Sequence, residues 1–165
     1  MPPTLQISHH PPLLRLAQRL LWLWLLLWCT GGVTATAPGS PQLDLPRTHL
    51  QIAGHRLEVQ LAITPEQRQK GLMFRETLPE KEGMLFLFEE SKERCFWMKQ
   101  TPLPLAIAFL DEQGRIVHHA EMRPFDPQLT CSLQPVRYVL EMGGGWFTRR
   151  GIGHGAVVEG VPGVL

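Results

Sequence analysis

The chain has 165 residues, with 16 Lys and Arg against 15 Asp and Glu, and 44% of it is hydrophobic. This near-neutral charge lacks the basic surface with which proteins neutralise phosphates, so it argues against nucleic acid as a partner. The length suffices for one domain with a single hydrophobic core.

The N-terminal segment is typical of a secretory signal. Arg15 and Arg19 precede the apolar run "LLWLWLLLW", and small residues follow it. A membrane-spanning helix needs about 20 apolar residues, and "CTGGVTATAPGSP" interrupts this run too early. We therefore predict a signal peptide at residues 1–37, cleaved after Ala35 or Ala37, and an exported protein that is periplasmic or secreted. In the alternative, an uncleaved signal anchors the protein and provides its only membrane contact.

The segment after the signal predicts a short tether and then one folded domain. Because Arg15 and Arg19 are the only charged residues before position 38, the remainder carries 14 basic and 15 acidic residues. Three prolines in "PGSPQLDLPR" indicate a tether at residues 38–47. The β-rich domain is expected at residues 48–165.

The first elements of the domain follow from alternation and capping. Apolar and polar residues alternate on both sides of Gly54, which predicts a β-hairpin. Thr64, Pro65 and Gln67 occupy the N-cap, first-turn and capping-box positions of a short helix from Pro65 to about Met73. The apolar run "GMLFLF" then predicts a strand buried on both faces, and "EESKER" an exposed loop.

The remaining elements are strands and turns. Strands are expected at residues 95–100 and 105–111, with a turn at "DEQG". In "RIVHHAEM" one face should carry Ile116, His118, Ala120 and Met122. In "VRYVLEM" one face should carry Val136, Tyr138, Leu140 and Met142, with Arg137, Val139 and Glu141 opposite. "GGGWFTRRG" is expected to form a second short helix. These elements predict a β-rich α+β fold, a small barrel-like or strongly curved antiparallel sheet with one or two short helices.

Three segments in this order resemble a known family. "GLMFRETLPEKEGMLFLFEE", "FWMKQTPLPLAIAFLDEQGRIV" and "VRYVLEM" are similar to the family called domain of unknown function 192, or uncharacterised protein family 0127, over roughly residues 48–160. The resemblance implies a compact β-rich fold, frequent export and no established activity. Gln100 stands where the family pattern tends to have Asn, and Ala106 and Ala156 stand where acids are common. If those acids serve chemistry in relatives, this chain lacks it.

The strongest candidate for a ligand site is the stretch "FWMKQ". In a strand, Phe96 and Met98 would face the core while Trp97 and Lys99 lie together on the other face. Trp97 could stack on a flat ligand or sugar ring, and Lys99 could hold its anionic group. The alternative is a Trp packed under a loop with a solvated Lys at its edge.

Three further residues complete the candidate ligand site. Arg75 could face the same cleft as Lys99, or it could form a surface ion pair with Glu76, Glu80 or Glu82. Gln100 carries an amide one methylene longer than the family's Asn. Asp111 and its acidic neighbours could serve acid–base chemistry, or they could simply be solvated near the turn.

Sulfur-containing side chains suggest two other features. His118 with Met98 and Met122 could form a soft copper site in an exported protein, although methionine at apolar positions is usually core filler. We expect no resident cofactor. Cys95 and Cys131 could form a disulfide in an oxidising compartment, or they could be two separate buried thiols.

Together these patterns favour an envelope-associated binding or interaction module, whose partner is an envelope ligand or protein. The chain has no G-x-S-x-G nucleophile motif. One alternative is a hydrolase or transferase of envelope material that uses Asp111, Lys99 and Arg75. The other is a soft-metal binding protein.

Overall fold

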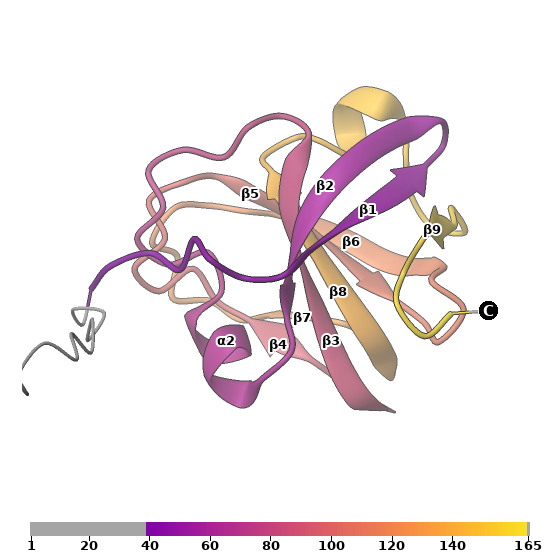
Figure 1. Ribbon diagram of the computed structural model, residues 1–165, viewed down its shortest axis with the longest axis horizontal. Coiled ribbons are helices and arrows are strands. Elements are labelled where there is room, and N and C mark those ends of the chain that lie inside the picture. The colour runs from indigo at the N-terminus through magenta and orange to yellow at the C-terminus, as the bar shows by residue number, and fades with distance from the viewer. Residues whose placement is uncertain (1–38, 165) are drawn as a thin grey trace, which may run out of the picture. The chain divides into compact units, whose positions relative to one another are not determined.

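The computed structural model describes residues 39–164, which belong to the compact unit Ala37–Leu165 (Figure 1). The predicted signal peptide and its cleavage sites lie outside the described residues. The elements, in chain order, are β1 (Arg47–Ile52), β2 (His55–Ala62), α2 (Pro65–Lys70), β3 (Glu82–Lys92), β4 (Cys95–Phe96), β5 (Leu105–Leu110), β6 (Ile116–Met122), β7 (Thr130–Cys131), β8 (Val136–Gly143), the 3-10 helix η1 (Thr148–Arg150) and β9 (Val158–Glu159).

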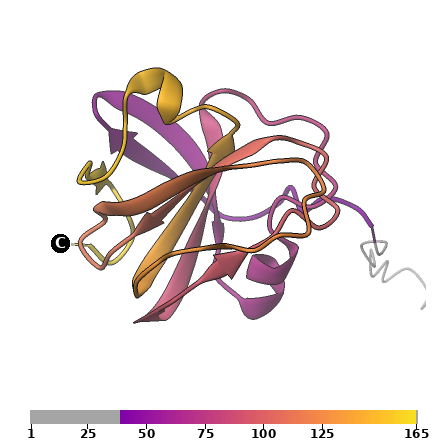
Figure 2. The ribbon, with the colours of Figure 1, turned by 180° about the vertical axis from the view of Figure 1, so that it is seen from behind.

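A seven-stranded sheet in the order β6-β5-β8-β3-β2-β1-β9 forms the body of the domain, and β4 pairs with β7 in a separate two-stranded sheet. Figures 1 and 2 show the large sheet strongly curled. The predicted β-rich fold class is therefore confirmed. One pair departs from the antiparallel expectation, since β2 and β3 run parallel. The chain passes through α2 between these two strands, and such a crossover returns it in the same direction.

The N-terminal elements form as the sequence indicates. β1 pairs with β2 around the turn at Ala53 and Gly54. The hydroxyl of Thr64 accepts from the backbone N–H of Gln67, and the Gln67 side chain accepts from the N–H of Thr64, which completes the capping box. The helix ends at Lys70, before the expected Met73, because Gly71 has a positive φ of 49°.

The segment expected to be a tether is hydrogen-bonded to the domain in its described part. The amide of Gln42 donates to the carbonyl oxygens of Gln67 and Gly71, each at 2.9 Å. Gln60 donates to the carbonyl of Leu43, and Leu45 packs against the core. The tether prediction is therefore wrong for these residues, because hydrogen bonds and apolar packing attach them to the domain.

Two strand predictions need correction. β3 continues to Lys92, so "EESK" belongs to a strand that protrudes beyond the core rather than to a loop. β4 ends at Phe96 instead of Gln100. There the backbone N–H of Met98 donates to the carbonyl of Asp126 at 3.1 Å, and this contact with a neighbouring loop replaces strand pairing.

β-bulges also change the predicted faces. Leu110 pairs with Ile116, but Phe109 pairs with His118, so Val117 is an extra residue in β6. Ile116 therefore lies in a different core cluster from Met122. In β8, Val136 packs with Val139, whereas Tyr138, Leu140 and Met142 face the opposite side.

The curled sheet separates two hydrophobic clusters. The first packs residues of β1, β2 and β8 against Trp146, Phe147 and the C-terminal segment. The second packs Leu72, Phe86, Met98 and Phe109 on the other face of the sheet, toward α2 and β4. Because successive residues of a strand face opposite sides, Leu140 and Met142 belong to the first cluster and Glu141 points toward the second.

Candidate functional site

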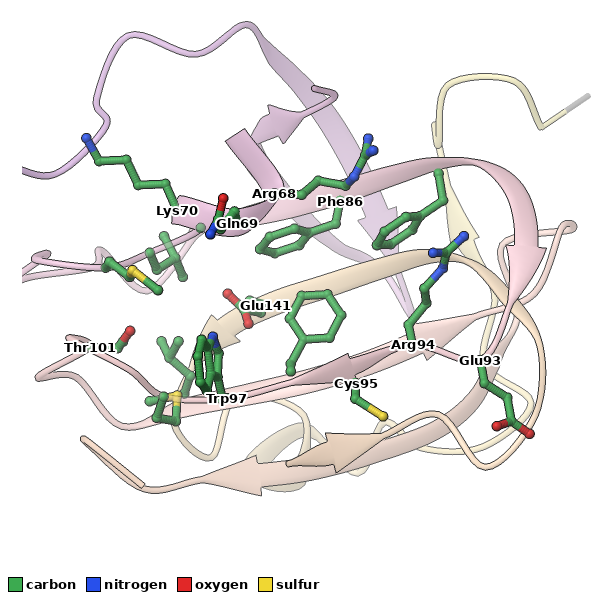
Figure 3. Close-up of a pocket in the computed structure, with 17 residues that line it drawn as sticks. Arg68, Gln69, Lys70, Phe86, Glu93, Arg94, Cys95, Trp97, Thr101 and Glu141 are labelled. Atoms are coloured by element: carbon green, nitrogen blue, oxygen red, sulfur yellow. The ribbon is translucent and has the colours of Figure 1, made fainter. Parts of the chain in front are cut away.

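A cavity of about 360 Å³ lies between α2, β3 and β4, over the second hydrophobic cluster. Figure 3 shows its lining. The lining residues come from Arg68–Met73, from Phe86 and Phe88 of β3, from Glu93–Met98, and from Thr101, Leu105 and Glu141. Segments distant in the sequence therefore share one space.

Glu141 is the buried acidic residue of this cavity. Its side chain is 4% exposed, and Figure 3 shows the carboxyl group directed into the space between Phe86 and Trp97. No hydrogen bond or ion pair joins this carboxyl to another of the described residues. Burial raises the pKa of Glu141 to about 8, because an apolar environment disfavours the charged form.

The backbone position of Glu141 is fixed by close pairing of β8 with β3. Gly83 pairs with Met142, and Met84 pairs with Glu141. A Cβ atom at Gly83 would clash with the carbonyl oxygen of Glu141, so only glycine permits this approach.

Apolar and aromatic side chains surround the carboxyl. The rings of Phe86 and Phe96 meet edge to face, with centroids 4.9 Å apart. Leu72, Met98 and Leu105 are each at most 2% exposed. Trp97 stands at the edge of the cavity with 47% of its surface exposed, so the lining has an aromatic residue available to a ligand.

One end of the cavity is basic. The guanidinium carbon of Arg68 lies 5.0 Å from the centroid of the Phe88 ring, and that of Arg94 lies 4.0 Å from it. The backbone holds both groups, since Arg68 donates to the carbonyl of Leu87 and Arg94 to that of Glu90, each at 2.9 Å. Burial and the nearby charge of Arg68 lower the pKa of Arg94.

Trp97 and Lys99 lie together, but only Trp97 lines the cavity. The ammonium of Lys99 is 5.2 Å from the centroid of the Trp97 ring. Their proximity arises in an irregular segment after β4, not from strand alternation. Gln100 is exposed in a turn and has a left-handed φ of 52°.

Asp111 lies away from the cavity. Its carboxylate accepts from the backbone N–H groups of Gln113 and Arg115 at 2.9 and 2.8 Å, as a turn residue does. It follows the last residue of β5, whereas Leu105, which lines the cavity, is the first. The length of this strand separates them by roughly 17 Å.

Arg75 is buried, so the prediction of a surface ion pair is wrong. Its side chain is 5% exposed, and it donates to the carbonyl of Gln42 at 2.7 Å and to the side-chain oxygen of Gln60. None of the ion pairs in the described part of the chain includes Arg75. Desolvation lowers the pKa of its guanidinium. Arg75 therefore joins β2 to the N-terminal segment and does not line the cavity.

The proposed metal ligands are only partly brought together. Met98 and Met122 line a second cavity, which His118 does not. The His118 ring instead stacks on Phe109, with centroids 5.9 Å apart, and burial lowers its pKa. Residues 39–164 contain no group of three or more His, Cys, Asp and Glu placed to hold a metal ion.

Cys95 and Cys131 form a disulfide. They pair directly across β4 and β7, and Cys95 also contributes to the cavity lining. The disulfide therefore fixes the small sheet that forms one wall.

Sequence reasoning did not single out Glu141, Arg68 or Arg94 as site residues. An acid inside the apolar run "YVLEMG" is a usable signal for Glu141, because carboxylates are rarely buried without a partner. No sequence pattern relates Arg68 to Arg94. Only the fold brings both guanidinium groups to the ring of Phe88.

The fold and cavity define a small, curled β-sheet protein with an aromatic pocket around one buried acid. Within the described residues, no helix is long and apolar enough to cross a membrane. The family described as Uncharacterized ACR (DUF192) matches residues 48–160, and the chain belongs to this family.

Two solved structures are similar to this chain. A candidate transcription regulator from Sinorhizobium meliloti has a TM-score of 0.70 and 34% identity, over 72% of this chain and 97% of its own. A protein of unknown function from Novosphingobium aromaticivorans has a TM-score of 0.69 and 34% identity, over 76% of this chain and 94% of its own. No curated protein shows a significant match.

Proposed function

We propose that this protein is an exported, envelope-associated binding module that holds a small ligand in the cavity beside Glu141. The observation that carries the proposal is Glu141, a buried residue whose carboxyl has no partner among the described residues and is directed into the cavity. An unpaired buried acid costs folding free energy, and such groups concentrate at functional sites.

The cavity has the character of a small-molecule site. Its volume of about 360 Å³ falls within the range of ligand pockets, which are mostly apolar with a few polar groups that orient the ligand. Phe86, Phe96 and Trp97 provide the aromatic surface, and Glu141 provides the polar group.

Binding at this cavity can be tested by NMR titration of ¹⁵N-labelled protein lacking residues 1–37 with a library of ring-containing fragments. The described domain suits this test, because nearly the whole chain of a solved relative aligns with it. We expect saturable shifts at residues 69–73 and 96–101 and at Glu141. Shifts scattered over the surface, or none with any fragment, would contradict the proposal.

Export is supported by the order of basic, apolar and small residues at the N-terminus. Expression of the full chain in a Gram-negative host, followed by mass spectrometry of the periplasmic protein, tests it. We expect an N-terminus at Thr36 or Pro38. Intact protein that stays in the cytoplasm would contradict export without affecting the cavity proposal.

A hydrolase or transferase of envelope material is the second candidate function. The raised pKa of Glu141, about 8, favours it, since acid–base catalysts work best with a pKa near the operating pH. In such an enzyme Glu141 would be the acid–base group, because Asp111 and Arg75 do not line the cavity. New products from envelope fragments, absent with Glu141→Gln, would favour the enzyme over the binding module.

A further inference from the structure

In the described part of the chain, the two arginines beside Phe88 form no ion pair. The ion pairs among the described residues join Arg47 to Glu58 and Glu82, Lys92 to Glu90, and Arg150 to Glu80. Among residues 39–164, Arg68 and Arg94 therefore place two positive charges at one end of the cavity without a carboxylate within ion-pair distance. Burial and the charge of Arg68 lower the pKa of Arg94, and the charge of Glu90 opposes this effect. An anion bound close to both groups would offset their repulsion.

Both guanidinium groups are oriented by the protein and still have donors to offer. The Nη1 atom of Arg68 donates to the carbonyls of Ile63 and Leu87, and Nη2 of Arg94 donates to the carbonyl of Glu90. Their other nitrogen atoms make no hydrogen bond to the described residues. In particular, Nε of Arg94 is buried and has no partner. A guanidinium fixed in this way is suited to bind a carboxylate or phosphate group.

The nearest acids act on these arginines without forming an ion pair among the described residues: Glu66 interacts with Arg68, and Glu90 with Arg94. The carboxylate of Glu90 is 2.6 Å from the ammonium of Lys92. Figure 3 shows the carboxylate of Glu93 directed away from the guanidinium of Arg94. Lys70 adds a third positive charge to the cavity lining, against the single negative charge of Glu93.

We propose that the cavity binds a small organic anion, whose carboxylate or phosphate group is held at the end lined by Arg68 and Arg94 and whose apolar part extends along Phe96 toward Glu141. This inference rests on the proposed function, because it names the ligand class of the same cavity.

Glu141 is compatible with an anionic ligand. The other charged groups of the lining are Arg68 and Lys70 from α2, and Glu93 and Arg94 from the segment before β4. With a pKa raised to about 8 by burial, Glu141 is mostly uncharged at pH 7, so it can donate a hydrogen bond without repelling the ligand. Above pH 8 its ionised form opposes the anion.

The inference is tested by calorimetric titration of the domain with four probes of similar shape: benzoate, phenyl phosphate, benzyl alcohol and benzylamine. We expect an anionic probe to bind at least about tenfold more tightly than benzyl alcohol, and benzylamine to bind most weakly. Benzoate and phenyl phosphate distinguish a carboxylate from a phosphate preference. Acetate and inorganic phosphate, which lack the ring, should bind weakly.

Matched variants locate the anion site. Arg68→Gln and Arg94→Gln should each weaken the anionic probes about tenfold and leave benzyl alcohol unchanged. Arg56→Gln removes one positive charge at an exposed position outside the cavity lining and should have little effect. Where Arg94→Gln fails to fold, Arg94→Lys and a salt series on the unmodified protein give the same comparison.

The outcomes separate this inference from the proposed function. Tight binding of benzyl alcohol or benzylamine relative to benzoate and phenyl phosphate would overturn the anion site while leaving a ligand cavity. Equal losses with Arg56→Gln and Arg94→Gln would also overturn it. Failure of all four probes and of the whole fragment library would overturn both.

Discussion

Gln60 and Glu141 lie in one row across the curled sheet, on either side of Met84. Gln60 pairs with Met84 between β2 and β3, and Met84 pairs with Glu141 between β3 and β8. Residues directly opposite each other share a sheet face, so both polar side chains point to the same buried side, with backbones roughly 10 Å apart. Gln60 is bonded to Arg75, whereas Glu141 has no partner among the described residues.

This contrast separates a structural polar group from a candidate functional one. The network of Arg75, Gln60 and Gln42 fastens the N-terminal segment to the sheet. The carboxyl of Glu141 has no such partner among the described residues and faces the cavity. Glu141 is therefore the candidate functional group of the two.

The first prediction concerns the pH dependence of stability. The pKa of Glu141 in the folded protein, about 8, exceeds its ordinary value of 4.5. The free energy of unfolding is therefore highest below pH 4.5, where Glu141 is protonated in both the folded and the unfolded chain. It falls as pH rises from 4.5 through 8, because the unfolded chain releases this proton more readily than the folded protein does. Glu141→Gln should remove this loss, worth up to roughly 5 kcal/mol. Urea unfolding from pH 4 to pH 9 measures it.

The control for this experiment is Glu112→Gln, an identical chemical change at an exposed position. It should leave the pH profile of the free energy of unfolding unchanged. A Glu141→Gln profile parallel to that of the unmodified protein would show that Glu141 ionises normally in the fold.

The second prediction concerns the buried network of Arg75. Arg75→Gln leaves the carbonyl of Gln42 and the side chain of Gln60 without their donor. Loss of a charged hydrogen-bonding group in a buried site should lower the free energy of unfolding by about 3 kcal/mol. Chemical denaturation measures this loss, and Arg56→Gln at an exposed position is the control. Similar stability of the two variants would disprove a structural role for Arg75.

The third prediction concerns the disulfide between Cys95 and Cys131, which are 36 residues apart in sequence. The Cys95→Ser/Cys131→Ser double variant should lose roughly 4 kcal/mol, because the open chain gains entropy when unfolded. Equilibrium unfolding of the oxidised protein, the reduced protein and the variant measures the loss. The reduced protein should match the variant, and a reduced protein as stable as the oxidised one would contradict the prediction.

The sequence predicted the elements that depend on neighbouring residues. The hairpin at Gly54, the capping box of Thr64 and Gln67, and the turn at Asp111 all arise from contacts between residues close in the chain. The curled β-rich fold follows from many short strands separated by turns.

The candidate site was harder to predict because its contacts are long-range. Alternation placed Glu141 opposite Leu140 and Met142, but it does not tell whether a face is solvated or covered by α2 and β4. Arg75 looked like a surface residue because Gln42 and Gln60 are distant in the sequence. Strand alternation predicts the face of Trp97 only if the strand continues to Gln100. β4 instead ends at Phe96, because the backbone N–H of Met98 donates to the carbonyl of Asp126 in a neighbouring loop.

The last prediction concerns Gln100, where the family pattern tends to have Asn. Gln100 has a left-handed φ of 52°, and its carbonyl accepts from the N–H of Phe74 at 2.7 Å. Asn tolerates this conformation better than Gln does, so Gln100→Asn should raise the free energy of unfolding by roughly 0.5 kcal/mol. Thermal unfolding should show a higher midpoint for Gln100→Asn but not for Gln113→Asn, whose φ is not positive. An unchanged or lower midpoint for Gln100→Asn would mean that the longer side chain makes a compensating contact.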